Sequence, residues 1–474
     1  MEKFQIESPK HIKAKKNKMD RRDFLKSSAA LAVTATTLQS CKDYAREDYD
    51  PTDKPKWKNW SELHKANPKV IAAPKDEAEL VKLMKEAKTV RFAGTSHSFM
   101  PLIPNDDTII SLDNFKGVLS VDKEKVQARV GAGTKLFFLS SELDKHGQAL
   151  ASIPDINTQS FAGAMSTGTH GTGKKWQAMH AYVKAIKIVA PTGVVYECSE
   201  TQNPDIFQAA KVSVGTLGAI TEVTLQNRPA YNVHKTVKVQ ELDWVWKNAQ
   251  NSFETAEHFE IYYIPHTNLV ALLTSEIHEG EVQDRPNSED ENALKDLKML
   301  RDYFSWSPWL RKKLASTMGK PDDVIEDFKD KSFKSLAQPR VTKFNESEYH
   351  IPKENAFACF KEVVELIDSM PGTYYPVELR NIKQDDAWLS PFYMKDCYSI
   401  AVHADNTEEY QYLLDDFGKI FRKHGGRPHW GKLNDFTKED FAAAYPKWND
   451  FLAVRQKLDP EGKLLNEYTR KIFG

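Results

Sequence analysis

The stretch RFAGTSHSF, at residues 91–99, decides how the chain is interpreted. Residues 90–93 have the pattern of a short strand, which runs into a tight turn of small residues. Side chains this small let backbone N–H groups approach a pyrophosphate, and the hydroxyl groups of the loop add further donors. His97 stands in this loop, although a loop histidine by itself is most often a surface residue. The stretch therefore predicts a strand followed by a loop that holds a pyrophosphate.

Two later stretches share this composition. Residues 160–173 read SFAGAMSTGTHGTG, and residues 213–221 read SVGTLGAIT and lead into a strand. The first could be a plain flexible loop, but Phe161, Met165 and His170 interrupt it, so it lacks the monotony of a linker. No G-x-G-x-x-G motif follows a first strand, which leaves a Rossmann domain unsupported. The sequence thus offers three small-residue loops as candidate binding segments.

The first 41 residues carry export signals. Arg21 and Arg22 precede a mild apolar stretch at 27–38 that is too short and too rich in Ala and Thr for a membrane span. This pattern indicates a twin-arginine signal, which exports folded proteins to the periplasm. The letters LQSC at 38–41 resemble a lipobox, so Cys41 is a candidate lipid anchor; simple cleavage and a retained basic tail are the alternatives. Residues 42–56 read as a linker.

Composition excludes some classes of partner. The 474 residues suffice for two domains with hydrophobic cores. A formal net charge of -1 indicates neither a nucleic acid nor an acidic partner. Four cysteines are too few and too scattered for a disulfide framework, so we expect buried free thiols at Cys198, Cys359 and Cys397. We predict no metal site.

The pattern of elements changes near residue 232. Residues 57–232 alternate short strands, glycine turns and helices, including a helix at 76–87 with apolar residues on one face. Residues 233–425 predict an antiparallel sheet with helices on one face, interrupted by a charged insertion near 277–335. Residues 426–474 form a final segment, which we expect to complete the active site and pack on the first domain.

The three loops, in this order and spacing, resemble the FAD-binding domain of the vanillyl-alcohol-oxidase type. Stretches in the second half resemble the aldonolactone oxidases and the alditol oxidases, with the alditol oxidases the closer match. These stretches are EYHIP at 348–352, ELR at 378–380, WLSP at 388–391, HWGK at 429–432 and LDPEGK at 458–463. The resemblance covers roughly residues 57–473. It implies an α+β flavoprotein with an FAD-binding domain and a substrate (cap) domain built on an antiparallel sheet.

The resemblance also implies a flavin site. In this family the histidine of the first loop bonds to the 8α-methyl group of FAD, and His97 occupies that position; noncovalent FAD beside His97 is the alternative. The residues expected to bind FAD lie on the three loops and the preceding strand. They are Arg91, Gly94, Thr95, Ser96, His97, Ser98, Ser160, Gly163, Ala164, Ser166, Thr167, Gly168, His170, Gly171, Gly215, Gly218 and Ile220.

The second domain supplies the catalytic candidates. Glu378 and Arg380 stand two apart on a predicted strand and therefore face the same way, and Lys432 follows a rigid Pro-His-Trp-Gly segment. Oxidation of an alcohol moves hydride to flavin N5 while the hydroxyl loses its proton, so fixed positive charge from Arg380 and Lys432 would help. Glu378 could orient Arg380 or accept hydroxyl hydrogen bonds, and a structural ion pair is the alternative. The general base stays open; Lys432 qualifies only with a lowered pKa.

The chain departs from the alditol oxidase pattern at several positions. Those enzymes carry a serine where Ala164 stands, and His and Thr near the positions of Ala401 and His403. A register shifted by two residues would place His403 in the pocket in place of their histidine. The substrate, a polyol, sugar or sugar lactone, therefore need not be a simple alditol. In the lactone branch of the family, a small residue at the position of Gly163 is associated with access of oxygen to the flavin. The resemblance therefore favours an oxidase that produces H2O2.

Other readings remain at this point. A membrane-tethered enzyme could instead pass electrons to a quinone or cytochrome, as a dehydrogenase of the same fold. A carbohydrate-binding lipoprotein without turnover and a nucleotide-sugar reductase are further alternatives. A colourless purified protein would favour the carbohydrate-binding lipoprotein, and oxidation of NADPH would favour the nucleotide-sugar reductase.

Overall fold

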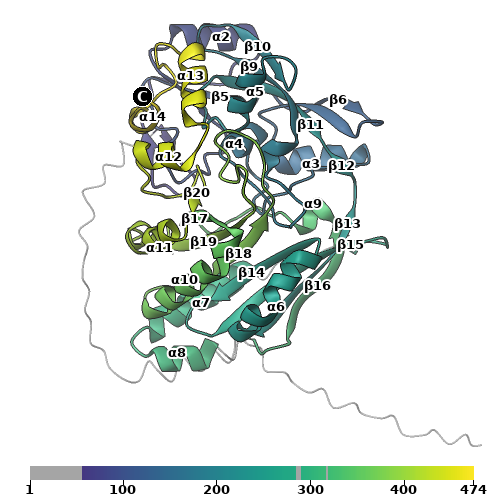
Figure 1. The fold of residues 1–474 in the computed structure, drawn as a ribbon, viewed down its shortest axis with the longest axis vertical. Coiled ribbons are helices and arrows are strands. Elements are labelled where there is room, and N and C mark those ends of the chain that lie inside the picture. Colours follow the sequence, from purple (N-terminus) through teal and green to yellow (C-terminus); the bar gives the residue numbers. More distant parts are fainter. Residues whose placement is uncertain (1–55, 284–289, 316–318) are drawn as a thin grey trace, which may run out of the picture. The chain divides into compact units, whose positions relative to one another are not determined.

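Two small sheets carry the loops that hold most of the predicted flavin contacts. The computed structural model describes residues 56–283, 290–315 and 319–474 (Figure 1). One sheet is parallel, in the order β3 (Val70–Ala72), β5 (Thr108–Ser111) and β4 (Val90–Ala93). The other is antiparallel, in the order β10 (Val195–Ser199), β9 (Val183–Val189), β11 (Ala219–Gln226), β7 (Gln127–Gly131) and β6 (Val118–Asp122).

Helices and short strand pairs complete this half. Helix α2 (Glu77–Glu86) begins where the Asp76 side chain accepts the Glu79 N–H, and it buries Leu80 and Met84, as the spacing predicted. This half contains further short elements. They are β1 (Trp57–Lys58) with β2 (Lys65–Ala66), α3 (Leu136–Lys145), β8 (Gln148–Ala149) with β12 (Arg228–Pro229), α4 (Phe161–Ser166), the 3₁₀ helix η1 (Met179–Tyr182) and α5 (Pro204–Lys211).

The second half is built on one sheet of eight strands. All neighbouring strands are antiparallel, as predicted. Their spatial order is β16 (Val324–Lys331), β13 (Asn232–Glu241), β15 (Leu269–His278), β14 (His258–Ile264), β18 (Val377–Ile382), β19 (Cys397–Asp405), β17 (Phe344–Pro352) and β20 (Arg427–Pro428). Strands β17, β18 and β19 are almost wholly buried. Because alternate residues of a strand face opposite sides of the sheet, both faces of these strands are covered.

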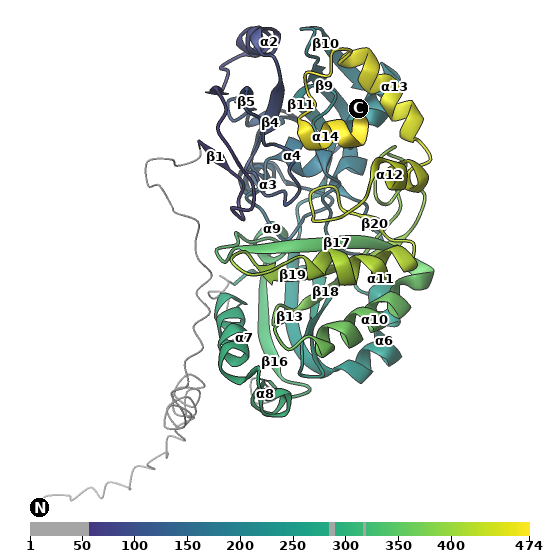
Figure 2. The ribbon, with the colours of Figure 1, turned by 90° about the vertical axis from the view of Figure 1, so that its left-hand side faces the viewer.

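Helices lie on both sides of this sheet. Helices α6 (Leu242–Thr255) and α10 (Ala356–Ser369) cover one side, and α7 (Asp290–Phe304) lies on the other (Figure 2). The charged insertion contributes helix α7 to this side of the sheet. The other elements of this half are α8 (Pro308–Ala315), α9 (Ser332–Ser335), the 3₁₀ helix η2 (Lys353–Asn355), the π-helix η3 (Leu413–Phe417) and α11 (Gly418–Lys423).

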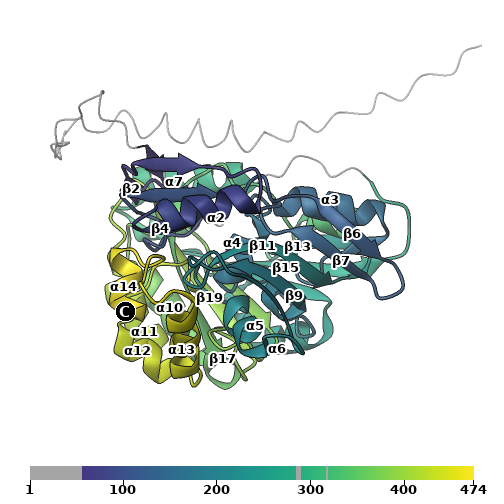
Figure 3. The ribbon, with the colours of Figure 1, turned by 90° about the horizontal axis from the view of Figure 1, so that it is seen from above.

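The last segment returns to the first half. It contains α12 (Lys438–Ala444), α13 (Trp448–Leu458) and α14 (Glu467–Phe473), and α13 contacts α5 (Figure 3). The loop between α13 and α14 reaches β4, where the carbonyl of Leu464 accepts a hydrogen bond from Arg91. The C-terminal segment therefore fixes the strand that precedes the His97 loop.

Cysteines and the leader complete the description. Cys198, Cys359 and Cys397 are buried free thiols, as expected. Cys41 and the export signal lie outside the described residues. Among the described helices, none is both long and apolar enough to cross a bilayer.

Candidate active site

A cleft lies where the three small-residue loops meet. Its empty volume is about 930 Å³, part of it open to solvent. Most of the predicted flavin-binding residues line it. They are Arg91, Gly94, Thr95, Ser96, His97, Ser98, Ser160, Gly163, Ala164, Ser166, Thr167, Gly215, Gly218 and Ile220. Three segments that are distant in the sequence therefore form one binding surface.

The backbone of this cleft needs residues without bulk. A Cβ atom on Gly94 would lie 2.2 Å from the Ser160 Oγ atom, so any larger residue would force the Ser160 side chain to move. Val214 has a φ of 53°, which is unusual for a β-branched residue. Its conformation is held at both ends, because its N–H donates to Ser166 and its carbonyl accepts from Arg91. A narrow, preorganised cradle of this kind fits a pyrophosphate-bearing cofactor such as FAD.

Arg91 ties the cradle together from behind. Its buried guanidinium donates to the carbonyl oxygens of Leu102, Val214, Gly215 and Leu464 at 2.5–3.0 Å. Burial lowers its pKa to about 10, partly offset by the charge of Asp459. Arg91 therefore fixes the first and third loops and the C-terminal segment while it lines the cleft.

His97 is held in one orientation within the cleft. Its ring stacks on Trp60 with centroids 5.1 Å apart, and its Nδ1 and Nε2 atoms lie 3.0 Å from Thr95 Oγ1 and 3.2 Å from Thr158 Oγ1. Burial and the nearby charge of Lys432 lower the pKa of His97 to about 4. At neutral pH the ring is uncharged, so one of its nitrogens carries a free electron pair.

A second, larger cavity lies against the eight-stranded sheet. It has about 1890 Å³ of empty volume, part of it open to solvent, and Gln159 lines both this cavity and the cleft. The four predicted catalytic residues, Glu378, Arg380, His403 and Lys432, all line it. The structure therefore brings them together.

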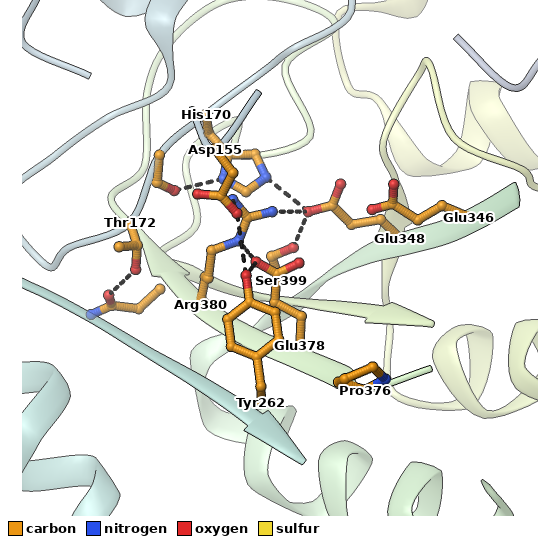
Figure 4. Close-up of polar contacts among 12 residues, drawn as sticks. Asp155, His170, Thr172, Tyr262, Glu346, Glu348, Pro376, Glu378, Arg380 and Ser399 are labelled. Atoms are coloured by element: carbon orange, nitrogen blue, oxygen red, sulfur yellow. Dashed lines mark hydrogen bonds and ion pairs between the residues drawn. The ribbon is translucent and has the colours of Figure 1, made fainter. Parts of the chain in front are cut away.

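Arg380 is the centre of an ion-pair network (Figure 4). Its Nε, Nη1 and Nη2 atoms lie 2.9 Å from Glu378, 3.3 Å from Asp155 and 3.2 Å from Glu348. Burial opposes the charge, but these three acids raise the pKa of Arg380 well above its ordinary value. Arg380 is thus a permanent cation in a buried site.

Glu348 accepts several hydrogen bonds on one oxygen. Its Oε1 faces His170 Nε2 at 3.0 Å and accepts from Arg380 and from the Ser399 hydroxyl. Burial would raise its pKa, but His170, Lys432 and Arg380 hold it well below the ordinary range. Glu348 therefore stays ionised and orients the cations around it.

Lys432 joins the cavity to the His97 loop. Its ammonium group contacts Glu346, lies 3.8 Å from Glu348 and stands 5.3 Å from the centre of the Phe99 ring. The carbonyl of its neighbour Gly431 accepts the Phe99 N–H at 2.7 Å. Lys432 therefore puts a cation where this cavity approaches the His97 loop.

His403 presents one ring nitrogen to the cavity. Its Nδ1 lies 3.2 Å from the Pro376 carbonyl, which can only accept, so Nδ1 carries the proton. Its Nε2 lies 3.7 Å from Glu346 Oε1. Burial lowers the pKa of His403, although Glu346 acts in the opposite direction.

Comparison with known proteins identifies the family. A family model described as D-arabinono-1,4-lactone oxidase matches residues 223–472, and a model described as FAD binding domain matches residues 68–199. The chain belongs to the D-arabinono-1,4-lactone oxidase family. It is 31% identical to L-gulono-1,4-lactone dehydrogenase of Mycobacterium tuberculosis, over 89% of this chain and 99% of the relative. It is 30% identical to L-gulonolactone oxidase of Mus musculus, over 88% and 98%.

Solved structures confirm the fold. Cholesterol oxidase from Brevibacterium sterolicum aligns with a TM-score of 0.71 and 15% identity, over 88% of this chain and 96% of that chain. The expected α+β architecture, with an FAD-binding domain and a sheet-based substrate domain, is therefore confirmed. A model of the twin-arginine signal matches residues 18–37, which confirms the predicted export route. This lactone oxidase family member is an FAD-linked oxidoreductase that acts on a CH–OH group.

Three predicted flavin contacts lie elsewhere in this family member. Gly168, His170 and Gly171 do not line the flavin cleft, and His170 lines the substrate cavity instead. A Cβ atom on Gly171 would lie 2.4 Å from the carbonyl oxygen of Ile153, so its smallness serves loop packing. The family resemblance implied a flavin role for these positions, whereas the residues of this segment that line the cleft end at Thr167.

The sequence also left several site residues unassigned. Asp155, Glu346, Glu348, Tyr262 and Ser399 line or brace the cavity, yet none was selected. The alternation of residues on β17 could have identified two of them. Glu346 and Glu348 stand two apart on one strand and so share a face, as Glu378 and Arg380 do on β18.

Proposed function

We propose that this protein carries FAD covalently attached to His97 and oxidises a carbinol of a sugar lactone or a related polyol. The observation that carries the proposal is the position of Lys432, which reaches the His97 loop and the Arg380 network at once. The curated relatives are named for lactone oxidation or dehydrogenation, which supports a sugar lactone. The start of β13 at Asn232 supports our proposed domain boundary at residue 232.

The cleft residues would hold the FAD. The loops around Gly94 and Gly163 would hold the pyrophosphate, and the uncharged ring of His97 would supply the electron pair for a bond to the flavin 8α carbon. The 8α-methyl group would lose a proton in exchange, and the two electrons left on the flavin would pass to the electron acceptor, O2. When bound, FAD would accept a hydride from the substrate carbon. Thr95 and Thr158 would fix the orientation of the attached ring.

The cavity residues would handle the hydroxyl proton. His403 Nε2 would accept this proton, and Glu346 would stabilise the imidazolium that forms. Arg380 and Lys432 would stabilise the developing alkoxide. Glu378 would orient Arg380, from which it lies 2.9 Å, and it accepts a hydrogen bond from the Tyr262 hydroxyl.

Covalent attachment predicts flavin fluorescence that survives denaturation. We expect the wild-type band on a denaturing gel to fluoresce, and the His97→Ala band to be dark, because no other ring nitrogen lies at that position. His146→Ala, at the exposed end of α3, is the control and should stay fluorescent. FAD released from the denatured wild type would refute the bond.

The proton transfer predicts a pH dependence. Since a base must be uncharged to act and burial lowers the pKa of His403 below its ordinary 6.5, the rate of anaerobic flavin reduction should rise with pH and level off below 6.5. His403→Asn should slow reduction about 100-fold and abolish this inflection. Rapid-mixing absorbance measures both. An unchanged profile in the variant would remove His403 as the base.

We propose O2 as the electron acceptor, with H2O2 as product. Gly163 lines the cleft without a side chain, and a Cβ atom there would lie 3.0 Å from Ser160 Oγ. One peroxide should form for each substrate consumed in air, and Gly163→Leu should lower the rate of flavin reoxidation by O2 at least tenfold. Reduced flavin that is stable in air but oxidised by a quinone would establish the dehydrogenase alternative.

We also propose that Cys41 is lipidated and anchors the exported enzyme at the membrane. The position of this cysteine just after the matched export signal supports the proposal. Metabolic labelling with a fatty acid should mark the wild type and not Cys41→Ser; equal labelling of both, or of neither, would exclude the anchor.

A further inference from the structure

The substrate cavity is larger than a sugar lactone requires. Its empty volume of about 1890 Å³ is roughly twice the 930 Å³ of the flavin cleft, and both are partly open to solvent. A five- or six-carbon lactone is several times smaller than FAD, yet the cavity assigned to it is the larger of the two. The cavity therefore has room for a group beyond the lactone ring.

Polarity changes across the sheet that forms its floor. In register, one row of residues runs from His350 through Ser399, Arg380 and Glu260 to Leu273 and Val237. The next row runs from Glu348 through Ala401, Glu378 and Tyr262 to Ala271. In both rows the residues on β15 are apolar, and in the first row the polar residue Glu326 on β16 follows Val237.

The apolar end lies two strands from Arg380. Arg380 on β18 and Leu273 on β15 share one row and lie about 10 Å apart across the sheet. Side chains from β13, β15, α7 and the segment after α9 line this end. We call it the apolar chamber, formed by Val237, Ala271, Leu273, Leu294, Leu297 and Leu336.

The chamber is only partly hydrophobic core: Val237 and Leu297 are buried, and its other members are half-buried. On the same strand, Val270 and Leu272 face the other side of the sheet and are 0% and 5% exposed, whereas Ala271 and Leu273 are only half-buried. On α7, Leu300 is 1% exposed and Leu294 is half-buried. Helix α7 lies on the side of the sheet opposite to α6 and α10 (Figure 2). Apolar surface is therefore left open between α7 and β15.

We propose that the cavity binds a two-part substrate, in which a polyhydroxylated unit is joined to an alkyl or aryl group. The polyhydroxylated unit lies at Arg380 and Lys432, and the apolar group fills the apolar chamber. The inference rests on the proposed function, because that function assigns the polar end as the place of oxidation. An apolar group would gain affinity by leaving water, and a free lactone would leave the chamber wet.

Calorimetric titration of the full-length flavoprotein with two probes tests this. Methyl β-D-glucopyranoside and hexyl β-D-glucopyranoside, the latter below its micelle concentration, differ only in five methylene groups. Because each buried methylene contributes to binding, we expect hexyl glucoside to bind at least tenfold more tightly. Equal affinities would overturn the proposal.

Variants locate the preference. Leu273→Asp on β15 and Leu294→Gln on α7 should each reduce the hexyl preference at least fivefold, with the methyl glucoside affinity and flavin content unchanged. Leu119→Asp, at an exposed position on β6, is the matched control and should keep the preference. A preference that survives in both chamber variants would show that the alkyl chain binds elsewhere and would overturn the proposal.

The readout separates this inference from the proposed function. Calorimetry reports binding without turnover, so the alkyl preference is measured even if no lactone or polyol reduces the flavin. Failure of flavin reduction with the preference intact would count against the proposed function. Reduction by free lactones with no alkyl preference would count against the chamber alone.

Discussion

Lys432→Met is expected to keep its flavin and to slow anaerobic flavin reduction about 100- to 1,000-fold, as the loss of one preorganised charge at an oxyanion does. The ammonium group contacts Glu346 and lies 3.8 Å from Glu348, so these acids hold it at the junction of cleft and cavity. Lys432 does not line the flavin cleft itself, which is why flavin content should be unchanged. Methionine retains most of the side-chain volume and removes only the charge.

Rapid mixing of the oxidised enzyme with substrate in the absence of O2 measures this step through the loss of flavin absorbance. Lys471→Met is the matched control, because Lys471 is exposed on α14 and pairs only with Glu467 at the surface. The control should reduce at the wild-type rate. A Lys432→Met enzyme that also reduces at the wild-type rate would leave Lys432 with no catalytic role.

Local rules predicted the parts of the site that lie within one element. The period of two on β18 placed Glu378 and Arg380 on one face, and the small residues of 91–99 placed His97 in a cleft loop. Both conclusions depend only on neighbours in the sequence. The family resemblance then supplied Lys432, whose role depends on a contact with a distant loop.

The same rules could not predict contacts between segments that are distant in the sequence. His170 meets Glu348 across 178 residues, and Arg380 meets Asp155 across 225. No periodicity encodes such a pairing, so His170 was grouped with its glycine-rich neighbours and Asp155 was not selected. The apolar chamber escaped for a related reason, because half-buried leucines on β15 have the same pattern as core leucines.

Arg380→Met is expected to abolish measurable reduction, with a loss of at least 1,000-fold, and to destabilise the protein by about 3–5 kcal/mol at pH 8. Asp155, Glu348 and Glu378 all face this guanidinium. Removing one partner of a buried ion pair leaves the others uncompensated, and this residual charge, rather than a lost contact, accounts for most of the cost.

This origin of the cost fixes its dependence on pH. In the wild type, the pKa values of Asp155 and Glu348 are lowered, with burial opposing the effect of Arg380 and other cations. Carboxyl groups with a lowered folded pKa contribute stability above their unfolded pKa and lose it as pH falls through the folded pKa. In the variant, burial acts with less opposition, so these groups take up protons at a higher pH and the penalty shrinks in acid.

Urea unfolding of wild type and Arg380→Met at pH 8 and pH 5 measures the difference, and we expect a smaller loss of unfolding free energy at pH 5. Arg380→Lys is the matched control, because it keeps the charge but loses the fork that reaches three acids. It should recover much of the stability and little of the reduction rate. Equal destabilisation of Arg380→Met at both pH values would mean that packing, rather than charge, is what Arg380 contributes, and its assignment as the fixed cation of the site would then fail.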